Sequence, residues 1–353
     1  MKHIKSVMAV VCAAVTITCY ILPAVTASAV SSASLSIVPK KNYTIEAGKT
    51  VNDTLVIRNL DKEAPLELSL SVVDFTFDDD SGTPKLMLEE GAPQTTWSLK
   101  PFLAVPRQVS IEPNGSKTLD MSVSVPEGHG AGSYYSAIVY SSGEPVDGGN
   151  VGLSASGVTL VFASIPGTVN ENLRLEKFGM FDAVAKSGKG NYMTFSMDQP
   201  QTLAYTIKNE GNVTASPVGS ITITDIFGRE RLITDVNPNS SLALIGQSRT
   251  FNSCIKLKSQ AVDFDGTRSE ARQCDNPGMW PGFYRLSLNL FYGQNGNRTQ
   301  EITGSSVFWY MPMWFIVVLI VGLGALAFGI WRVVRMVRQK LYGPKIRKVS
   351  QRR

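Results

Sequence analysis

Short runs of alternating apolar and polar residues fill most of this chain. The clearest is TLDMSVSV, in which Leu119, Met121, Val123 and Val125 alternate with threonine, aspartate and serine. A strand that buries one face against a core needs this period of two. Gly, Pro, Asn and Asp separate such runs, and the others are TLVIR from Thr54, LELSLSVV from Leu66, TLAYTIK from Thr202, SITIT from Ser220 and RLSLNL from Arg285. No helical period of comparable length precedes residue 313, so the chain is predicted to be all-β up to there.

Part of this pattern occurs twice. The strand TLVIRN ends at Asn59 and AYTIKN ends at Asn209, 150 positions later. The same offset separates Gly132 in AGSYYSAIVY from Gly282 in PGFYRLSLNLFY. The turn PNGS at 113–116 returns as PNSS only 125 positions later, at 238–241, so each copy is predicted to carry its own insertion.

The repeated order predicts two tandem immunoglobulin-like β-sandwiches. A strand, an Asn-bearing turn, a second strand, a Gly-x-Tyr corner and a further strand follow one another in each copy. Tyr134 and Tyr284 stand where a tyrosine ties a corner to the backbone in such sandwiches. We therefore interpret the repeated glycine and tyrosine as framework.

Both ends of the chain carry membrane signals. Lys2 and Lys5, an apolar run through Leu22 and an A-x-A site at 27–29 predict a secretory signal peptide, with the mature chain beginning at Val30. Residues 313–331 contain no charge and, at ~1.5 Å per residue, nearly span a hydrocarbon core of about 30 Å. The predicted segments are the signal peptide (1–29), the first sandwich (30–167), the second sandwich (168–307), the transmembrane helix (308–331) and a basic tail (332–353).

Charge is distributed unevenly around the predicted helix. The tail carries nine Lys and Arg and no acidic residue, which by the positive-inside rule makes it cytoplasmic and the sandwiches extracellular. Without these nine and the two signal lysines, 23 of the 34 basic residues remain against 29 acidic ones, so the exported part carries about −6 although the whole chain carries +5. Attraction of the tail to anionic lipid explains the basic residues, and nucleic acid is not an expected partner.

Cys254 and Cys274 are the two cysteines that remain after the signal peptide is removed. They lie on the exported side, where disulfides persist, and are predicted to form one. The stabilisation should be mainly local, because the closed loop is short.

Catalytic and metal-binding patterns are absent from the sequence. The mature chain has one histidine, His129 in EGHGAG, which is interpreted as an exposed loop residue, and no nucleophile elbow, phosphate loop or zinc spacing accompanies it. Asp78 and Asp80 offer oxygen ligands for Ca²⁺, but they lack the spacing and distal Glu of an EF-hand loop, and a polar hairpin tip is preferred. The chain is thus predicted not to be an enzyme and to need no cofactor.

Several stretches resemble the WxL-interacting family of bacterial cell-surface proteins. They are the turn EAGKT at 46–50, TLVIRN, PNGSKTLDMSVSVP and GSYYSAIVY in the first copy, and KNEGNVTASPVGSITITDIFGRE and PGFYRLSLNLFYG in the second. The resemblance implies a non-catalytic exported protein held by one helix, whose first module contacts peptidoglycan and whose second contacts other surface proteins. The chain departs from it in the cysteine-bearing insertion and in the acidic hairpin near Asp78. No L-P-x-T-G sorting signal precedes the helix.

Aromatic residues are the candidate ligand contacts, because exposed rings stack on sugars and anchor protein interfaces. These are Trp97 with Phe102, and Trp280 with Phe283; core packing is the alternative for each. The expected function is a membrane-anchored scaffold that binds cell-wall glycan or surface proteins. Two rivals stay open: an envelope assembly factor that lends strands to secreted subunits, and the exported part of a sensor or secretion complex, for which Ala325 and Gly329 offer a small-residue helix contact.

Overall fold

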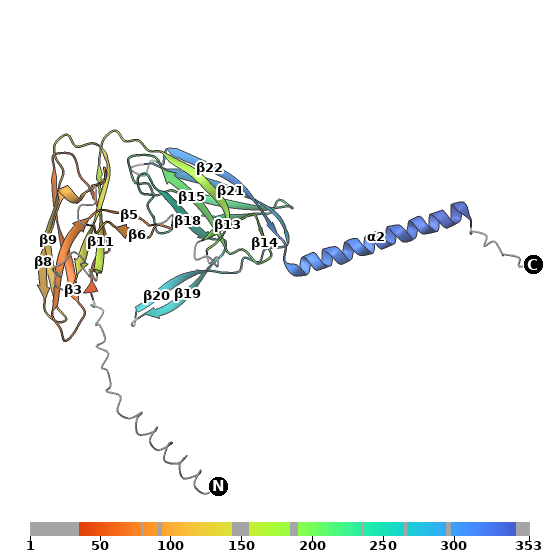
Figure 1. Ribbon diagram of the computed structural model, residues 1–353, viewed down its shortest axis with the longest axis horizontal. Helices are drawn as coiled ribbons and strands as arrows, with labels where there is room; N and C mark the ends of the chain where they lie inside the picture. The colour runs from red at the N-terminus through yellow and green to blue at the C-terminus, as the bar shows by residue number, and fades with distance from the viewer. Residues whose placement is uncertain are drawn as a thin grey trace, which may run out of the picture.

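A computed structural model describes residues 35–78, 81–89, 94–142, 155–183, 190–234, 236–264, 267–293 and 298–343. Two β-sandwiches follow one another and lead into a long helix, as Figure 1 shows. The predicted fold class, two immunoglobulin-like sandwiches followed by an apolar helix, is confirmed. The predicted signal peptide lies outside the described residues.

The first sandwich packs a four-stranded sheet, β1-β3-β9-β7, on a five-stranded sheet, β2-β11-β10-β4-β8. In TLDMSVSV, the apolar residues of the alternation are buried and face the opposite sheet, as the period of two requires. The strands are β1 (Leu35–Ser36), β2 (Lys40–Thr44), β3 (Thr50–Asn59), β4 (Leu66–Val73), β7 (Leu103–Ala104), β8 (Gln108–Ile111), β9 (Ser116–Ser124), β10 (Gly132–Ser141) and β11 (Ala155–Ile165).

The second sandwich repeats this arrangement with sheets β13-β12-β15-β18 and β14-β22-β21-β16-β17. The five-stranded sheets match strand for strand, and in each an N-terminal strand pairs in parallel with the last long strand, β2 with β11 and β14 with β22. The strands are β12 (Leu173–Asp182), β13 (Asn191–Met193), β14 (Phe195–Ser196), β15 (Thr202–Asn209), β16 (Val218–Asp225), β17 (Glu230–Ile233), β18 (Ser248–Cys254), β21 (Gly282–Tyr292) and β22 (Gln300–Tyr310).

The duplicated Gly-x-Tyr motif forms the same corner in both sandwiches. The hydroxyl of Tyr134 donates to the carbonyl of Gly130 at 2.9 Å, and that of Tyr284 donates to the carbonyl of Trp280 at 2.6 Å. Gly132 and Gly282 begin the two strands with φ of 151° and 153°, a region that favours glycine. The predicted tyrosine corners are therefore confirmed, and the motif is framework.

The other repeated element, the asparagine that ends β3 and β15, is a buried polar anchor. The side-chain amide of Asn59 donates to the carbonyls of Ala64, Ile111 and Glu112. That of Asn209 donates to the carbonyls of Val213 and Ala243, and its oxygen accepts from the backbone N–H of Gly211. Both side chains are almost fully buried, so these bonds satisfy backbone groups that water cannot reach.

Each insertion that the offset predicts forms a hairpin. In the first domain, β5 (Phe75–Phe77) pairs with β6 (Pro84–Leu86). In the second, β19 (Leu257–Phe264) pairs with β20 (Thr267–Cys274), and a disulfide joins Cys254 at the end of β18 to Cys274. The predicted disulfide is confirmed and closes the base of this hairpin.

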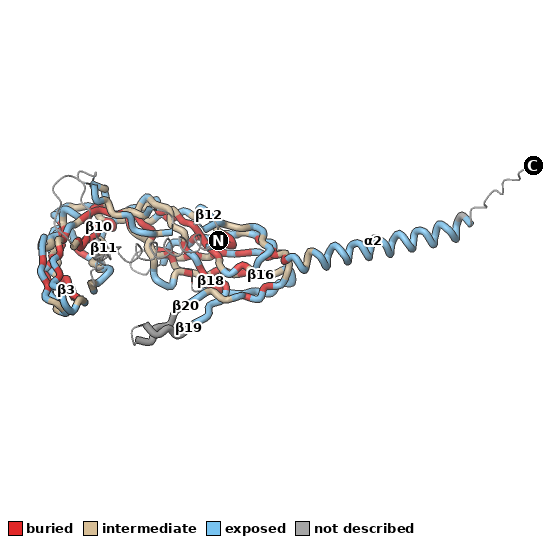
Figure 2. Tube along the Cα trace, turned by 60° about the horizontal axis from the view of Figure 1, so that its bottom comes forward, coloured by how far each residue is buried: buried red, intermediate tan, exposed pale blue. Residues whose placement is uncertain are grey.

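The helix α2 (Met313–Tyr342) is long and apolar enough to cross a membrane, and none of its most apolar stretch packs against the sandwiches. Figure 2 shows it exposed along its length, while buried positions concentrate inside the two sandwiches. The boundaries differ from the prediction at both ends. Residues 308–310 belong to β22, where buried Phe308 and Tyr310 alternate with Trp309 at 45% exposure, and the helix continues beyond Trp331 to Tyr342.

Candidate functional site

The two sandwiches meet through an apolar cluster that the sequence analysis did not predict. Phe75 from β5 and Tyr135 from β10, both almost fully buried, contact each other with ring centroids 5.1 Å apart. Phe162 from β11 lies within 6 Å of both rings. Leu244, from the loop before β18 of the second domain, completes the cluster and is fully buried. The first insertion therefore supplies part of the contact between the domains.

Polar contacts surround this cluster. The side-chain oxygen of Gln247 accepts from the backbone N–H of Phe77 at 3.0 Å, and its amide donates to the hydroxyl of Thr76. The guanidinium of Arg249 lies 4.8 Å from the centre of the Phe77 ring, a favourable cation–π distance. These contacts fix the insertion hairpin to the second domain.

A second set of interdomain bonds lies at the start of β10. The backbone N–H of Ser133 donates to the carbonyl of Asn212 at 3.1 Å, and the hydroxyl of Ser133 accepts from the N–H of Thr214 at 3.0 Å. A Cβ at Gly132 would lie 2.8 Å from the Asn212 carbonyl, so this approach requires glycine. The two sandwiches are thus joined by packing and by backbone hydrogen bonds.

Asp74, which the sequence analysis missed, fixes the segment that carries Trp97. This carboxylate is buried and accepts from the hydroxyls of Ser98 at 2.6 Å and Ser136 at 3.0 Å, and from the backbone N–H of Thr95 at 3.2 Å. A buried carboxylate needs such donors. Its sequence context, between β4 and the short strand β5 and close to an acidic run, gives no sign of burial.

Trp97 is placed within the interdomain cluster. Its ring stacks on Tyr135 with centroids 6.1 Å apart, and its indole nitrogen is buried. Phe102, from the 3₁₀ turn η1 (Lys100–Phe102), is half-buried in the first core and contacts His129 at 4.8 Å. The structure therefore does not bring Trp97 and Phe102 together on an open surface.

His129 differs from the exposed loop residue that we expected. It is half-buried between Phe102 and Tyr134, whose ring centroid lies 4.7 Å away. The bond from the Tyr134 hydroxyl to the Gly130 carbonyl holds this loop beside the two rings.

The second aromatic pair lies at the end of the second domain where α2 begins. Trp280 is 68% exposed, and Phe283 is half-buried against Trp309 with ring centroids 5.0 Å apart. Trp280 precedes the tyrosine corner of the second domain, whose hydrogen bond ends on its carbonyl.

The structure describes one of the two candidate calcium ligands, Asp78. Asp78 stands at the tip of the β5–β6 hairpin, where its carboxylate lies 3.3 Å from the amino group of Lys85. Both side chains are exposed, as a polar hairpin tip requires. Asp80 lies outside the described residues, and no group of three potential ligands occurs among the residues that the structure does describe.

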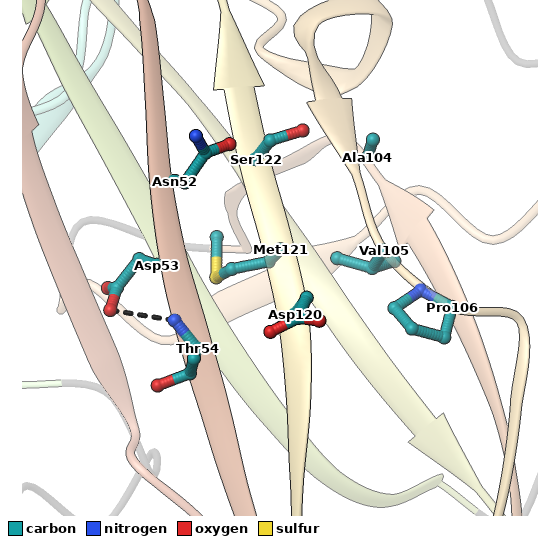
Figure 3. A pocket seen from close by; sticks show the side chains of 9 residues that line it. All are labelled: Asn52, Asp53, Thr54, Ala104, Val105, Pro106, Asp120, Met121 and Ser122. Atoms are coloured by element: carbon teal, nitrogen blue, oxygen red, sulfur yellow. Dashed lines mark hydrogen bonds between the residues drawn. The ribbon is translucent and has the colours of Figure 1, made fainter.

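The outer face of the first sandwich carries a shallow hollow, with a volume of about 640 Å³. Figure 3 shows the polar side chains of β3 and β9 on one side of it and the segment that follows β7 on the other. Its lining offers an amide, carboxylates and hydroxyls beside a small apolar wall: Asn52, Asp53, Thr54, Asp120, Met121, Ser122, Ala104, Val105 and Pro106. The sequence signals this site only as the polar half of an alternating strand.

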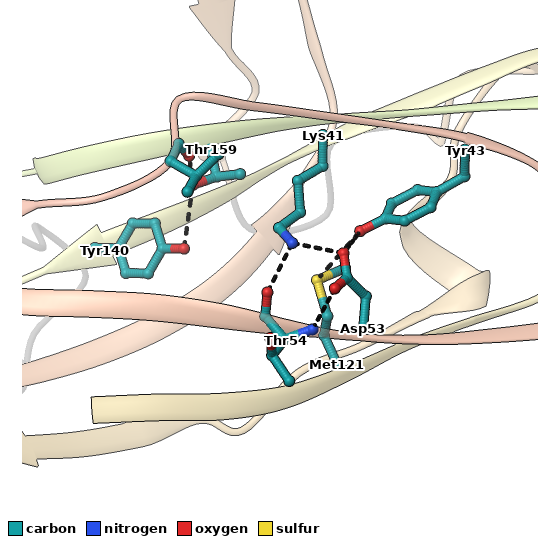
Figure 4. Close-up of polar contacts among 8 residues, drawn as sticks. Lys41, Tyr43, Asp53, Thr54, Met121, Tyr140 and Thr159 are labelled. Carbon is teal, nitrogen blue, oxygen red and sulfur yellow. Dashed lines mark hydrogen bonds and ion pairs between the residues drawn. The ribbon is translucent and has the colours of Figure 1, made fainter. Parts of the chain in front are cut away.

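A charged network lies beside this hollow and links the two sheets of the first domain (Figure 4). Asp53 accepts from the amino group of Lys41 at 2.5 Å, from the hydroxyl of Tyr43 at 2.6 Å and from the N–H of Thr54 at 2.7 Å. The hydrogen bonds from Lys41, then those from Tyr43 and Thr54, lower the pKa of Asp53 to about 2. Burial, with the contribution of Asp53 added, raises the pKa of Tyr43.

Asp53→Asn is expected to lower the free energy of unfolding by about 1 kcal/mol at pH 7, because the carboxylate is 36% exposed and its ion pair is partly screened. The pKa of Asp53 is lower folded than unfolded, so its contribution is complete above the unfolded value of about 3.9 and disappears as the pH falls toward 2. Urea unfolding of residues 30–311 at pH 7 and pH 2 should therefore show the difference between the two proteins only at pH 7. Asp120→Asn, an exposed carboxylate on β9, is the control and should change stability little at either pH.

Comparisons with known proteins give only distant similarities. No protein-family model matches the sequence, and no curated protein matches it. Among solved structures, the class 5 fimbriae chaperone CfaA is 12% identical with a TM-score of 0.35, over 77% of this chain and 98% of that one. The SafA pilin–SafB chaperone complex of Salmonella enterica (11%, 0.31, 79% and 96%) and the E. coli chaperone DraB (14%, 0.31, 68% and 96%) are similar to a comparable degree. Proteins as distantly similar as these do not indicate what this chain binds.

Proposed function

We propose that the chain is a non-catalytic, membrane-anchored surface protein whose two sandwiches form a binding scaffold for cell-wall glycan. The observation that carries this proposal is the way in which the two sandwiches and the helix are joined. The first sandwich is joined to the second by a buried cluster and hydrogen bonds, and the second leads directly into the apolar helix. Such a chain holds its outer domain at a distance from a membrane. Proteins that connect a membrane to a surrounding polymer need this property.

The hydrogen bonds of two aspartates and the packing of the histidine support a binding role. Asp53 and Asp74 are occupied by structural hydrogen bonds, and His129 is packed between two aromatic rings. General acid–base catalysis requires a group within hydrogen-bond reach of a substrate. In the described part of the chain, these groups instead stabilise the sandwich and its loops.

The hollow on the first domain is the proposed glycan site. Sugar hydroxyl and acetamido groups both donate and accept hydrogen bonds, and the amide of Asn52, the carboxylate of Asp120 and the hydroxyls of Thr54 and Ser122 complement them. Val105 and Pro106 supply an apolar wall for the ring carbons. The site is open, so it suits a chain that passes across it better than a small molecule that must be enclosed.

The site is tested with the variant Asn52→Ala/Asp120→Ala. In residues 30–311, it should weaken binding of soluble peptidoglycan fragments at least about tenfold, the cost of one or two charge-assisted hydrogen bonds, while leaving thermal stability unchanged. Isothermal calorimetry measures the affinity. Ser220→Ala/Ser287→Ala, in a comparable polar hollow of the second domain, is the matched control and should bind as the original protein does. Equal affinities of both variants for the fragments would show that this face of the first domain is not the glycan site.

A second candidate function, an envelope assembly factor, is supported by one edge of the first domain. β11 runs from Ala155 to Ile165, but β2 pairs with it only from Leu160 to Ser164. Just before β2, the carbonyls of Val38 and Pro39 accept from the Thr159 hydroxyl and the Leu160 N–H, so only the first residues of β11 pair with β10 alone among the described strands. That short backbone edge is where an extended segment of another protein can add. This function requires protein clients with exposed strands, whereas the scaffold requires none.

A further inference from the structure

Exposed apolar side chains collect at the end of the second domain from which α2 emerges. Phe227 is 75% exposed in the turn between β16 and β17, and Trp280 is 68% exposed in the loop before β21. Exposed apolar side chains that gather in one patch mark a surface that contacts a partner or a membrane. With their neighbours they form what we call the membrane-facing rim: Phe195, Ile226, Phe227, Trp280 and Trp309.

Strand pairing places the residues of the rim at the same height along the strands, near the end of β22. In the sheet, Asp225 is opposite Tyr284 and Tyr284 is opposite Phe308, so the turn that follows Asp225 lies at the level where β22 ends. Phe195 on β14 is opposite Trp309. Figure 1 shows β14 beside the first turn of α2. The rim therefore surrounds the point where the chain leaves the domain.

The connection to the helix is short and hydrogen-bonded. Only Met311 and Pro312 separate the end of β22 from the start of α2. The N–H of Met311 donates to the carbonyl of Ser196 at 3.0 Å, and the N–H of Phe315 donates to the carbonyl of Pro312 at 2.9 Å. A junction of this kind does not let the domain move far from whatever surrounds the helix.

The length of the uncharged segment indicates where a bilayer lies along the helix. Residues 313–331 carry no charge and measure roughly 28 Å as a helix, close to the hydrocarbon thickness of about 30 Å. The hydrocarbon boundary therefore falls near Met313. From Tyr310 to Met313 the extended chain covers at most about 10 Å, comparable with the thickness of the headgroup layer.

We propose that the membrane-facing rim lies in the headgroup layer of the bilayer and is covered by phospholipid. This inference rests on the membrane anchoring in the proposed function. Tryptophan and phenylalanine rings favour this layer, and all of these rings except Trp309 come from loops and strands distant in sequence from the helix. The guanidinium of Arg229 lies 5.5 Å from the Phe227 ring centre and is paired with the carboxylate of Asp225 at 2.6 Å, so the charges beside the rim neutralise each other. The rim adds a second attachment beside the helix, so the domain holds one orientation on the membrane.

The test uses the full mature chain in phosphatidylcholine–phosphatidylglycerol nanodiscs, with one chain per disc. A nitroxide is placed by Phe227→Cys and, as the control, by Leu60→Cys, a 49% exposed position in the first domain. Both sites are solvent-exposed in the described structure, so both variants should fold. Collision rates with dissolved oxygen and with a water-soluble nickel chelate then report depth. The label at 227 should collide several-fold less with nickel than the label at 60, and more with oxygen.

The outcomes separate this inference from the proposed function. Equal nickel collision rates at 227 and 60, in a chain that stays in the membrane fraction at alkaline pH, would overturn the rim alone. A chain that alkaline treatment extracts would overturn the anchoring as well. Protection that appears only with two chains per disc, with dipolar broadening between labels, would assign the rim to a second copy and contradict lipid contact. Trp280→Phe should independently reduce the quenching of tryptophan fluorescence by brominated lipid.

Discussion

Asn209→Ala is expected to lower the free energy of unfolding of residues 30–311 by about 3 kcal/mol. The alanine leaves the carbonyl of Val213 and the N–H of Gly211 without their partner, and the carbonyl of Ala243 keeps only its bond from the N–H of Ala215. Each unsatisfied buried group costs about 1–3 kcal/mol. Val213 and Ala243 are buried, so water does not replace the lost bonds. Urea unfolding followed by circular dichroism measures the change, which should appear as a shift of the single transition in which the two coupled domains unfold.

Asn252→Ala is the matched control, because Asn252 is exposed on the neighbouring strand β18. It should change stability by no more than about 0.5 kcal/mol. If Asn209→Ala were equally mild, the repeated asparagine would not be the anchor that we infer for both copies.

Phe75→Ala is expected to cost about 4 kcal/mol and to uncouple the two domains. Phe75 is almost fully buried against Tyr135 and Phe162, and removing a buried phenylalanine ring costs about 3–5 kcal/mol. Because the cluster also contains Leu244 of the second domain, its loss weakens the contact that makes the domains unfold together. Calorimetry of residues 30–311 should show one transition in the original protein and two in the variant.

Leu88→Ala is the control for Phe75→Ala, because it removes an exposed apolar side chain from the same insertion. It should leave a single transition at nearly the original temperature. A single, unshifted transition in Phe75→Ala as well would mean that the cluster does not couple the domains.

The alternation of apolar and polar residues was sufficient to predict the sandwiches, because a strand with one buried face has no other pattern available. The 150-residue repeat also predicted the tyrosine corners, since Tyr134 and Tyr284 make the same bond to the carbonyl four residues earlier. The end of β22 was assigned to the helix because Phe308, Trp309 and Tyr310 are all apolar and join the membrane segment without a charge. Their alternating burial and their pairing with β21 assign them to the strand.

The interdomain contact could not be predicted, because it depends on residues that meet only after both domains fold. Phe75 and Leu244 are far apart in sequence, and Leu244 comes from a loop without a strand pattern. Trp97 was a candidate surface aromatic for the same reason: nothing near it in the sequence signals that Tyr135 covers one face of its ring. Trp280 and Phe283 do lie near the surface, but their position beside α2 follows from the pairing of β21 with β22.

Sedimentation with isolated peptidoglycan shows whether this chain holds a glycan-binding domain above the membrane. The full mature chain in nanodiscs is mixed with isolated peptidoglycan at low and at high salt, with Asn52→Ala/Asp120→Ala as the comparison. We expect the protein to sediment with peptidoglycan at both salt concentrations and the variant to stay in solution. Failure of the original protein to sediment, together with stable complexes with unfolded secreted proteins, would contradict the scaffold and favour the assembly factor.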